Sequence, residues 1–151
     1  RFVNRELYKR WADDGYLTLC NGDSIDYLLI VDTILRQPLY TLKIGYDPYK
    51  ALEFTNLLRS TPQVGKANLE AIPQTNGSFN TAVMSFELAL SQDSITFDPN
   101  PITAYCFGNA VIDEDRLENR KPVKAVASGK IDGAITCLMD FWLFNHFKTI
   151  V

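Results

Sequence analysis

The chain has 151 residues, a hydrophobic fraction of 46% and a formal net charge of −3. This length suits one folded domain with one core, and the charge excludes a uniformly basic nucleic-acid-binding protein. No apolar run approaches the roughly 20 residues of a transmembrane helix, and no signal peptide is visible at the start of the chain. We therefore expect no association with a membrane.

The first half of the chain alternates between predicted helices and short predicted strands. Asp23 or Ser24 is a suitable N-cap for a helix, and Pro48 suits the first position of another. Gly15 and Pro38 mark points where helices end. We expect helices over 2–14, 23–36 and 48–59, and strands over 17–20, 40–46 and 69–72.

The second half continues the alternation with a stronger helical signal. Ser78 is a candidate N-cap, and Asn100 followed by Pro101 is typical of a helix start. We expect helices over 78–90, 101–109 and 130–148, an extended piece over 95–97, and two arms around a polar turn over 110–112 and 123–126. Helices that alternate with strands predict an α/β fold, in one domain over 1–151.

The cysteine and histidine content argues against a zinc site. Cys20, Cys106 and Cys137 are widely spaced, no CxxC pair is present, and His146 is the only histidine. A zinc site usually needs four such ligands close together. We expect three reduced, largely buried thiols of the kind found in cytosolic proteins.

Two acidic residues lie at the ends of predicted elements. Asp47 directly follows the strand over 40–46, and Asp132 lies in the first turn of the last helix. A strand end and a helix start can meet at one edge of an α/β sheet, where two carboxylates can bind a divalent metal. Each acid also fits a structural role, Asp47 as an N-cap and Asp132 at the positive end of a helix dipole. We interpret Asp140 as a surface acid, with auxiliary metal binding as the alternative.

Basic residues are concentrated in one stretch of the chain. Between Arg116 and Lys130 there are five basic residues and one acid, Glu118. Such a run is usually a solvated face, and the alternative is a patch that contacts DNA phosphates. Lys121, Lys124 and Lys130 are the candidate DNA-binding residues.

A series of short motifs follows one order along nearly the whole chain. The motifs are Trp11 with Gly15-Tyr16-Leu17, Gly22–Tyr27, Gly45–Ala51, Gln74 before the Ser78 helix, Asn100-Pro101, Asn109, Lys124 and Lys130–Ala134. Each motif is weak alone, but the ordered set resembles the C-terminal nuclease domain of the terminase large subunit of tailed bacteriophages.

The resemblance implies a ribonuclease H-like fold, in which helices flank a mixed sheet. It implies a DNA endonuclease that cuts concatemeric viral DNA during genome packaging, with two Mg²⁺ or Mn²⁺ ions held by clustered carboxylates. Asp47 and Asp132 match the family's second and last metal-binding acids. The implied partners are double-stranded DNA, the portal protein and the small terminase subunit, in the cytoplasm of the bacterial host.

The chain also departs from the family pattern. The family has a first metal-binding aspartate on a central strand upstream of the Trp11 region, and no residue here matches it. No GxxxxGK[ST] phosphate loop is present either. We therefore expect the first strands of the fold and the packaging ATPase to be missing, and this fragment to be inactive.

Loss of central strands would leave the strand over 40–46 with an unpaired apolar edge. We expect this edge to be covered by residues 17–20 or by self-association with a second chain. Two alternatives to the nuclease remain open. One is a non-catalytic docking or assembly module of the packaging motor, and the other is a different ribonuclease H-like nuclease, such as a junction resolvase.

Overall fold

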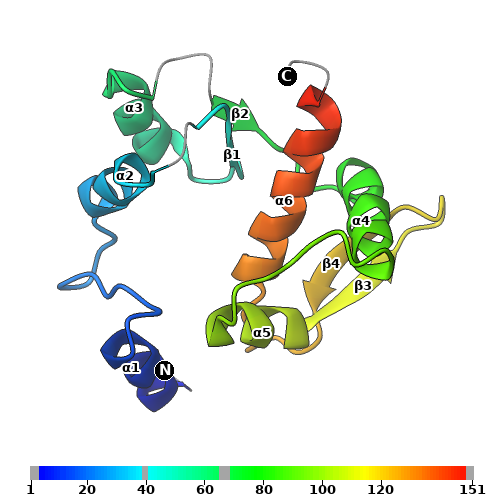
Figure 1. Ribbon diagram of the computed structural model, residues 1–151, viewed down its shortest axis with the longest axis horizontal. Helices are drawn as coiled ribbons and strands as arrows, with labels where there is room; N and C mark the ends of the chain where they lie inside the picture. The colour runs from blue at the N-terminus through cyan, green and yellow to red at the C-terminus, as the bar shows by residue number, and fades with distance from the viewer. Residues whose placement is uncertain (1–3, 39–40, 65–68, 149–151) are drawn as a thin grey trace. The chain divides into compact units, whose positions relative to one another are not determined.

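The structure, a computed structural model, describes residues 4–38, 41–64 and 69–148. The chain divides into two compact units, the larger formed by Arg1–Leu19 with Gln74–Val151 and the smaller by Cys20–Pro73. The mixed helices and strands agree with the predicted α/β class (Figure 1). The expectation of one domain over 1–151 stays a prediction. Within the described ranges, no helix is long and apolar enough to cross a bilayer.

The larger unit is mainly helical and carries one β-hairpin. Helix α4 packs against both α6 and strand β4, and α5 packs against α6 (Figure 1). The hairpin pairs β3 with β4 in antiparallel register, with Val111 opposite Val123. The elements of this unit are α1 (Arg5–Asp13), α4 (Asn76–Ser91), α5 (Pro101–Gly108), β3 (Ala110–Glu114), β4 (Arg120–Lys124) and α6 (Asp132–Phe147).

The core of the larger unit lies where α4 meets α6. From α4, Phe79 and Val83 are buried, and from α6, Leu138 and Met139 are buried. Phe79 and Val83 lie four residues apart on α4, as the buried residues Ala134 and Leu138 do on α6, which is the spacing of one apolar face. Trp142, on the same helix, is only half-buried.

Side-chain caps decide where two helices of the larger unit begin. Helix α5 begins as predicted, because the Asn100 side chain accepts a 2.9 Å hydrogen bond from the Ile102 amide. Helix α4 begins earlier than predicted, since Thr75 and not Ser78 is its N-cap. The Ser78 amide donates to the Thr75 hydroxyl oxygen over 3.2 Å. Both residues can cap a helix, and the upstream one does so here.

The smaller unit combines two short helices with a pair of short parallel strands. Ile44 lies opposite Leu69 and Tyr46 lies opposite Ala71. Its buried cluster consists of Val31, Leu58 and Val64. The elements of this unit are α2 (Tyr27–Leu35), β1 (Ile44–Tyr46), α3 (Leu52–Ser60) and β2 (Leu69–Ala71).

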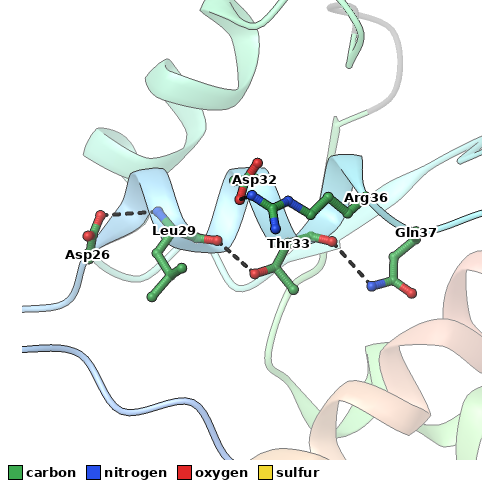
Figure 2. A network of polar contacts seen from close by, with 6 residues as sticks. All are labelled: Asp26, Leu29, Asp32, Thr33, Arg36 and Gln37. Carbon is green, nitrogen blue, oxygen red and sulfur yellow. Dashed lines mark hydrogen bonds and ion pairs between the residues drawn. The ribbon is translucent and has the colours of Figure 1, made fainter.

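Helix α2 begins later than predicted, at Tyr27 and not near Asp23. Its N-cap is Asp26, not Asp23 or Ser24, and the Asp26 carboxylate accepts a 3.1 Å hydrogen bond from the Leu29 amide (Figure 2). Figure 2 also shows an ion pair of 2.6 Å between Asp32 and Arg36, one turn apart. Val31 is the buried residue of this helix, whereas Leu28 is 68% exposed. Three neighbouring capping residues compete in this segment, so the sequence alone does not choose among them.

The strand predicted over 17–20 does not form, and this prediction was wrong. The amides of Tyr16 and Leu17 both donate to the Trp11 carbonyl oxygen, over 2.8 and 3.1 Å. Gly15, at φ +82°, makes the turn that allows this. The segment is therefore held against the end of α1 and not in a sheet. Among the described residues, β1 pairs with β2 alone.

Candidate active site

Asp47 lies at the end of β1, as predicted, but it does not cap the following helix. Its Oδ1 atom accepts a 2.9 Å hydrogen bond from the Tyr49 amide, which closes a tight turn. Lys50 then takes a positive φ of 54°, and α3 begins only at Leu52. The predicted helix start at Pro48 is therefore wrong, because the turn around Asp47 delays the helix by four residues.

The position of Asp47 is set by the pair of strands β1 and β2, because Asp47 directly follows β1. The carbonyl oxygen of Tyr46 accepts a 2.9 Å hydrogen bond from the Ile72 amide, so pairing of the two strands continues up to this point. The Asp47 side chain is exposed. A carboxylate with one oxygen in a local turn and its surface open to solvent has the chemistry of a ligand for a hard divalent cation.

Asp132 is the first residue of α6, close to the position predicted for it. Ile131 is the N-cap and contributes no side-chain bond to the helix start. Asp132 is exposed, and its charge lies at the end of α6 where free amides make the helix dipole positive. Asp132 thus carries a negative charge at a site that favours anions.

A pocket of about 280 Å³ adjoins Asp132 in the larger unit. Its lining combines aromatic and aliphatic side chains with two charged side chains and one thiol. The lining residues are Tyr8, Trp11, Leu17, Ile102, Tyr105, Cys106, Lys130, Asp132 and Gly133. Of the three lysines predicted to bind DNA, Lys130 is therefore the one that lies in the same pocket as Asp132.

The aromatic residues of this pocket pack on one another in a fixed arrangement. The rings of Tyr8 and Trp11 are stacked with centroids 5.6 Å apart, and Trp11 meets Tyr105 edge-on at 5.2 Å. The Asn4 side-chain amide donates a 2.8 Å hydrogen bond to the Tyr105 hydroxyl oxygen. Burial raises the pKa of Tyr8, and the nearby Tyr105 and the Asp132 charge raise it further. Tyr8 therefore stays protonated at neutral pH and can donate a hydrogen bond.

Close packing of α5 against α6 positions Asp132 from behind. A Cβ atom built on Gly133 would lie 3.2 Å from the sulfur of Cys106 and 3.3 Å from its Cβ. Cys106 is itself only 4% exposed. A larger residue at this position would require Cys106 or the start of α6 to shift by a few tenths of an ångström, so Gly133 allows the close approach of α6 to α5.

The other two lysines lie on β4. Successive side chains of a strand point to opposite faces, so Lys121 and Lys124 face opposite ways. Lys121 is half-buried, and its Nζ atom lies 3.5 Å from the Gln74 carbonyl oxygen. Arg120, next to it, forms an ion pair of 3.1 Å with Glu87. The three lysines therefore do not form one array on a single face, and their contact with DNA stays a prediction.

Sequence reasoning did not select Tyr8 or Tyr105 as site residues. A signal for Tyr8 was present, because it lies three residues before Trp11 on the same face of α1. No comparable signal exists for Tyr105, which reaches the pocket only because α5 packs against α6 and brings residues from distant parts of the sequence together.

The predicted meeting of Asp47 and Asp132 is not a property of either unit, because Asp47 belongs to the smaller unit and Asp132 to the larger. It stays a prediction. Over 4–38, 41–64 and 69–148, no three histidine, cysteine, aspartate or glutamate side chains form a group that could hold a metal. Oxygen ligands from these two acids fit Mg²⁺ or Mn²⁺ in kind, but they do not complete a metal site.

Comparison with known proteins places the chain in a family. A family model described as "Terminase large subunit, endonuclease domain" matches residues 2–147. The match covers almost the whole chain, and the protein belongs to this family of terminase endonuclease domains. The resemblance seen in the ordered motifs is thereby confirmed.

Two curated relatives and one solved structure agree with this family. Protein YmfN of Escherichia coli strain K12 is 28% identical over 143 residues, which cover 89% of this chain and 30% of that protein. The terminase large subunit of Enterobacteria phage HK97 is 25% identical over 146 residues, which cover 95% of this chain and 28% of that protein. The chain thus spans about three tenths of these relatives.

The crystal structure of the HK97 bacteriophage large terminase matches with a TM-score of 0.76 and 24% identity. The match covers 93% of this chain and 29% of that one. At this identity the likeness shows a shared fold, and it agrees with the predicted class of small mixed α/β domain.

Proposed function

We propose that this chain is the metal-dependent DNA endonuclease part of a packaging terminase, with a ribonuclease H-like arrangement of its elements. The observation that carries the proposal is the pocket at the start of α6. It brings the exposed acid Asp132 together with Lys130, in a chain that belongs to the terminase endonuclease family. The proposed substrate is concatemeric viral DNA, cut in the cytoplasm of the bacterial host.

In the proposed mechanism, Asp47 and Asp132 provide oxygen ligands for two divalent cations. A Mg²⁺ or Mn²⁺ ion held by these acids would supply activation of a water nucleophile and stabilisation of the leaving oxygen. The turn at Tyr49 orients the Asp47 carboxylate. The start of α6 supports a negatively charged group beside Asp132 through its free amides. Lys130 holds the DNA backbone by its charge, which carries no sequence information.

Asp47 and Asp132 need further metal ligands besides those in the described residues. Two carboxylates are fewer ligands than a two-metal site needs, and the described ranges contain no third acid in the same group. We therefore propose that another carboxylate of the intact terminase completes the site. These 151 residues alone should cut DNA poorly or not at all.

The proposed partners follow from the family and from the length of the relatives. Double-stranded DNA is the substrate, and the portal protein and small terminase subunit are the protein partners of the intact motor. Self-association through the second edge of β1 is a further proposal. It is supported by the pairing of β1 with β2 alone among the described residues.

A chimera tests the nuclease proposal. Residues 2–147 replace the matching segment of the HK97 large terminase, and cleavage of plasmid DNA is measured with Mn²⁺. We expect cleavage by the chimera, and a loss of at least about a hundredfold in Asp47→Ala and in Asp132→Ala, because each removes a metal ligand. Asp23→Ala, at an exposed acid of the smaller unit, is the matched control and should retain activity.

Two outcomes would contradict the proposal. One is a chimera that cuts DNA equally well with and without the Asp47 and Asp132 carboxylates. The other is a folded chimera that binds DNA but does not cut it with any divalent metal. The second result would favour a docking or assembly module.

A further inference from the structure

We propose that the pocket beside Asp132 binds a single unstacked nucleobase of a DNA strand, against the tyrosines Tyr8 and Tyr105. This inference rests on the proposed nuclease function, since it assigns the pocket to the substrate of that site. It adds a base-binding subsite to a reaction that otherwise needs only phosphate contacts.

The aromatic side chains of the pocket suit a flat ring. Trp11 is only 6% exposed and forms the interior wall, while Tyr8 and Tyr105 are half-buried and accessible. The three rings are fixed by their mutual contacts at 5.6 and 5.2 Å, so little side-chain freedom is lost when a ligand binds. Bases stack on such rings whatever their sequence, because every base has a π-face.

The polar atoms of the pocket fit the edge of a base and its phosphate. The Asn4 side-chain amide donates to the Tyr105 hydroxyl oxygen, and the hydroxyls of Tyr8 and Tyr105 form a hydrogen bond with each other. Both hydroxyls are neutral at pH 7, so this pair engages one hydroxyl proton and leaves the other for a ligand. Lys130 lines the same pocket, where its ammonium can pair with the phosphate of the bound nucleotide.

Size and chemistry favour an unpaired base over the alternatives. The pocket holds about 280 Å³, which suits one base with part of its sugar, whereas a base pair requires a wide groove. A free phosphate has no flat apolar face that could stack on the three aromatic rings of the pocket. Base flipping has an energetic cost, which is smallest when the strand is already single or frayed. The pocket should therefore prefer single-stranded DNA.

Trp11 provides a direct signal for occupancy of the pocket. The chain has two tryptophans, so Trp142→Phe leaves Trp11 as the sole indole. This variant is titrated, without metal, with an oligothymidine of about ten nucleotides and with an abasic oligomer of equal length. We expect saturable quenching by the oligothymidine, and binding of the abasic oligomer about ten-fold weaker, since stacking on aromatic side chains is lost.

Two substitutions locate the effect in the pocket. In the Trp142→Phe background, Tyr105→Leu should weaken oligothymidine binding about ten-fold and leave abasic binding unchanged, whereas Tyr105→Phe keeps the ring and most of the affinity. Tyr16→Leu, at an exposed tyrosine outside the pocket lining, is the control and should bind as the parent does. Near-ultraviolet circular dichroism confirms that each variant is folded.

Equal affinity for the oligothymidine and the abasic oligomer would overturn the inference, as would binding without any change at Trp11. The readout needs neither metal nor cleavage, so it separates this inference from the nuclease proposal. Selective base binding in a chain whose chimera never cuts DNA would leave the pocket assigned and reject the nuclease. Cleavage by the chimera without base selectivity in the pocket would support the nuclease and reject the base-binding pocket.

Discussion

The two units present their acidic residues on very different supports. Asp132 begins α6, a helix of 16 residues whose buried face packs on α4. Asp47 follows β1, a strand of three residues paired with another strand of three. Two strands alone are marginally stable, and parallel pairs are usually covered on both faces. The comparison teaches that Asp132 begins a helix held by a packed core, whereas Asp47 depends on a parallel pair of three-residue strands.

This difference leads to unequal local stability. Local opening of a protein follows the number of buried apolar contacts that hold each region. The smaller unit has a buried cluster of three residues, Val31, Leu58 and Val64. We expect the smaller unit to open first, and Asp47 to be more mobile than Asp132 before substrate or metal is bound.

The largest expected effect comes from the core of the smaller unit. Leu58 is fully buried, and Leu58→Ala should destabilise the smaller unit by about 2–5 kcal/mol because it leaves a cavity. Amide hydrogen exchange should show lost protection over Ile44–Tyr46, with protection of α6 retained. Leu138→Ala, in the core of the larger unit, is the reciprocal variant. Equal loss of protection in both units after either substitution would contradict the unequal local stability of the two units.

The next effect concerns the support of Asp132. In Gly133→Ala the added Cβ would lie 3.2 Å from the Cys106 sulfur, so either Cys106 or the start of α6 must shift by a few tenths of an ångström, and we expect a cost of about 1 kcal/mol. Gly77→Ala is the matched control, since no atom lies within 4 Å of its added Cβ. Thermal unfolding should show a lower midpoint for Gly133→Ala alone. An unchanged midpoint would mean that the contact does not position Asp132.

A smaller effect is expected at the turn of the hairpin. The Asp115 carboxylate accepts hydrogen bonds from the Asn119 and Leu117 amides, at 3.0 and 2.8 Å, and these bonds lower its pKa. The stabilisation is complete above the ordinary pKa of 3.8 and is lost as pH falls through the lowered value. Asp115→Asn should therefore be less stable than the parent at neutral pH, with a difference that shrinks in strong acid. A constant difference across pH would contradict this role.

The smallest effect is expected at Asp140. The residue is exposed, but its side chain lines a pocket with Phe141 and Phe144, and partial burial of its carboxyl group raises its pKa. A raised acid pKa makes the charged form unfavourable in the folded state, so the penalty is absent below pH 3.8 and reaches its full size above the raised value. Asp140→Asn should stabilise the larger unit slightly at neutral pH. Chemical denaturation at two pH values measures the difference.

Local patterns predicted the elements whose signals are unambiguous. Asn100 with Pro101 defines one helix start without a rival, and two arms of a hairpin form, although the second spans Arg120–Lys124 and not the predicted 123–126. Patterns failed where several neighbouring residues can cap the same helix, as at the start of α2. They also failed where a possible capping side chain forms a different hydrogen bond. A helix cap was the alternative interpretation of Asp47, and its side chain instead closes a turn on Tyr49.

The candidate site was predictable only in part. Both acids lie close to the positions expected from strand and helix ends, because those ends have local signals. The aromatic pocket was not predictable, since Tyr8 and Tyr105 are nearly a hundred positions apart and meet only through helix packing. Likewise, Lys121 and Lys124 lie on opposite faces of β4, because side chains alternate along a strand. The local excess of positive charge in the sequence gives no sign of this separation.

The central claim is that Asp47 and Asp132 hold the same metal ions, and Mn²⁺ reports on this directly. In a backbone NMR spectrum of the chain, substoichiometric Mn²⁺ broadens amides near its binding site. We expect the amides of Tyr49 and Gly133 to broaden together, and both effects to disappear in Asp47→Asn and equally in Asp132→Asn. Broadening at one of these amides alone, or survival of the signal at one acid after removal of the other, would contradict the claim.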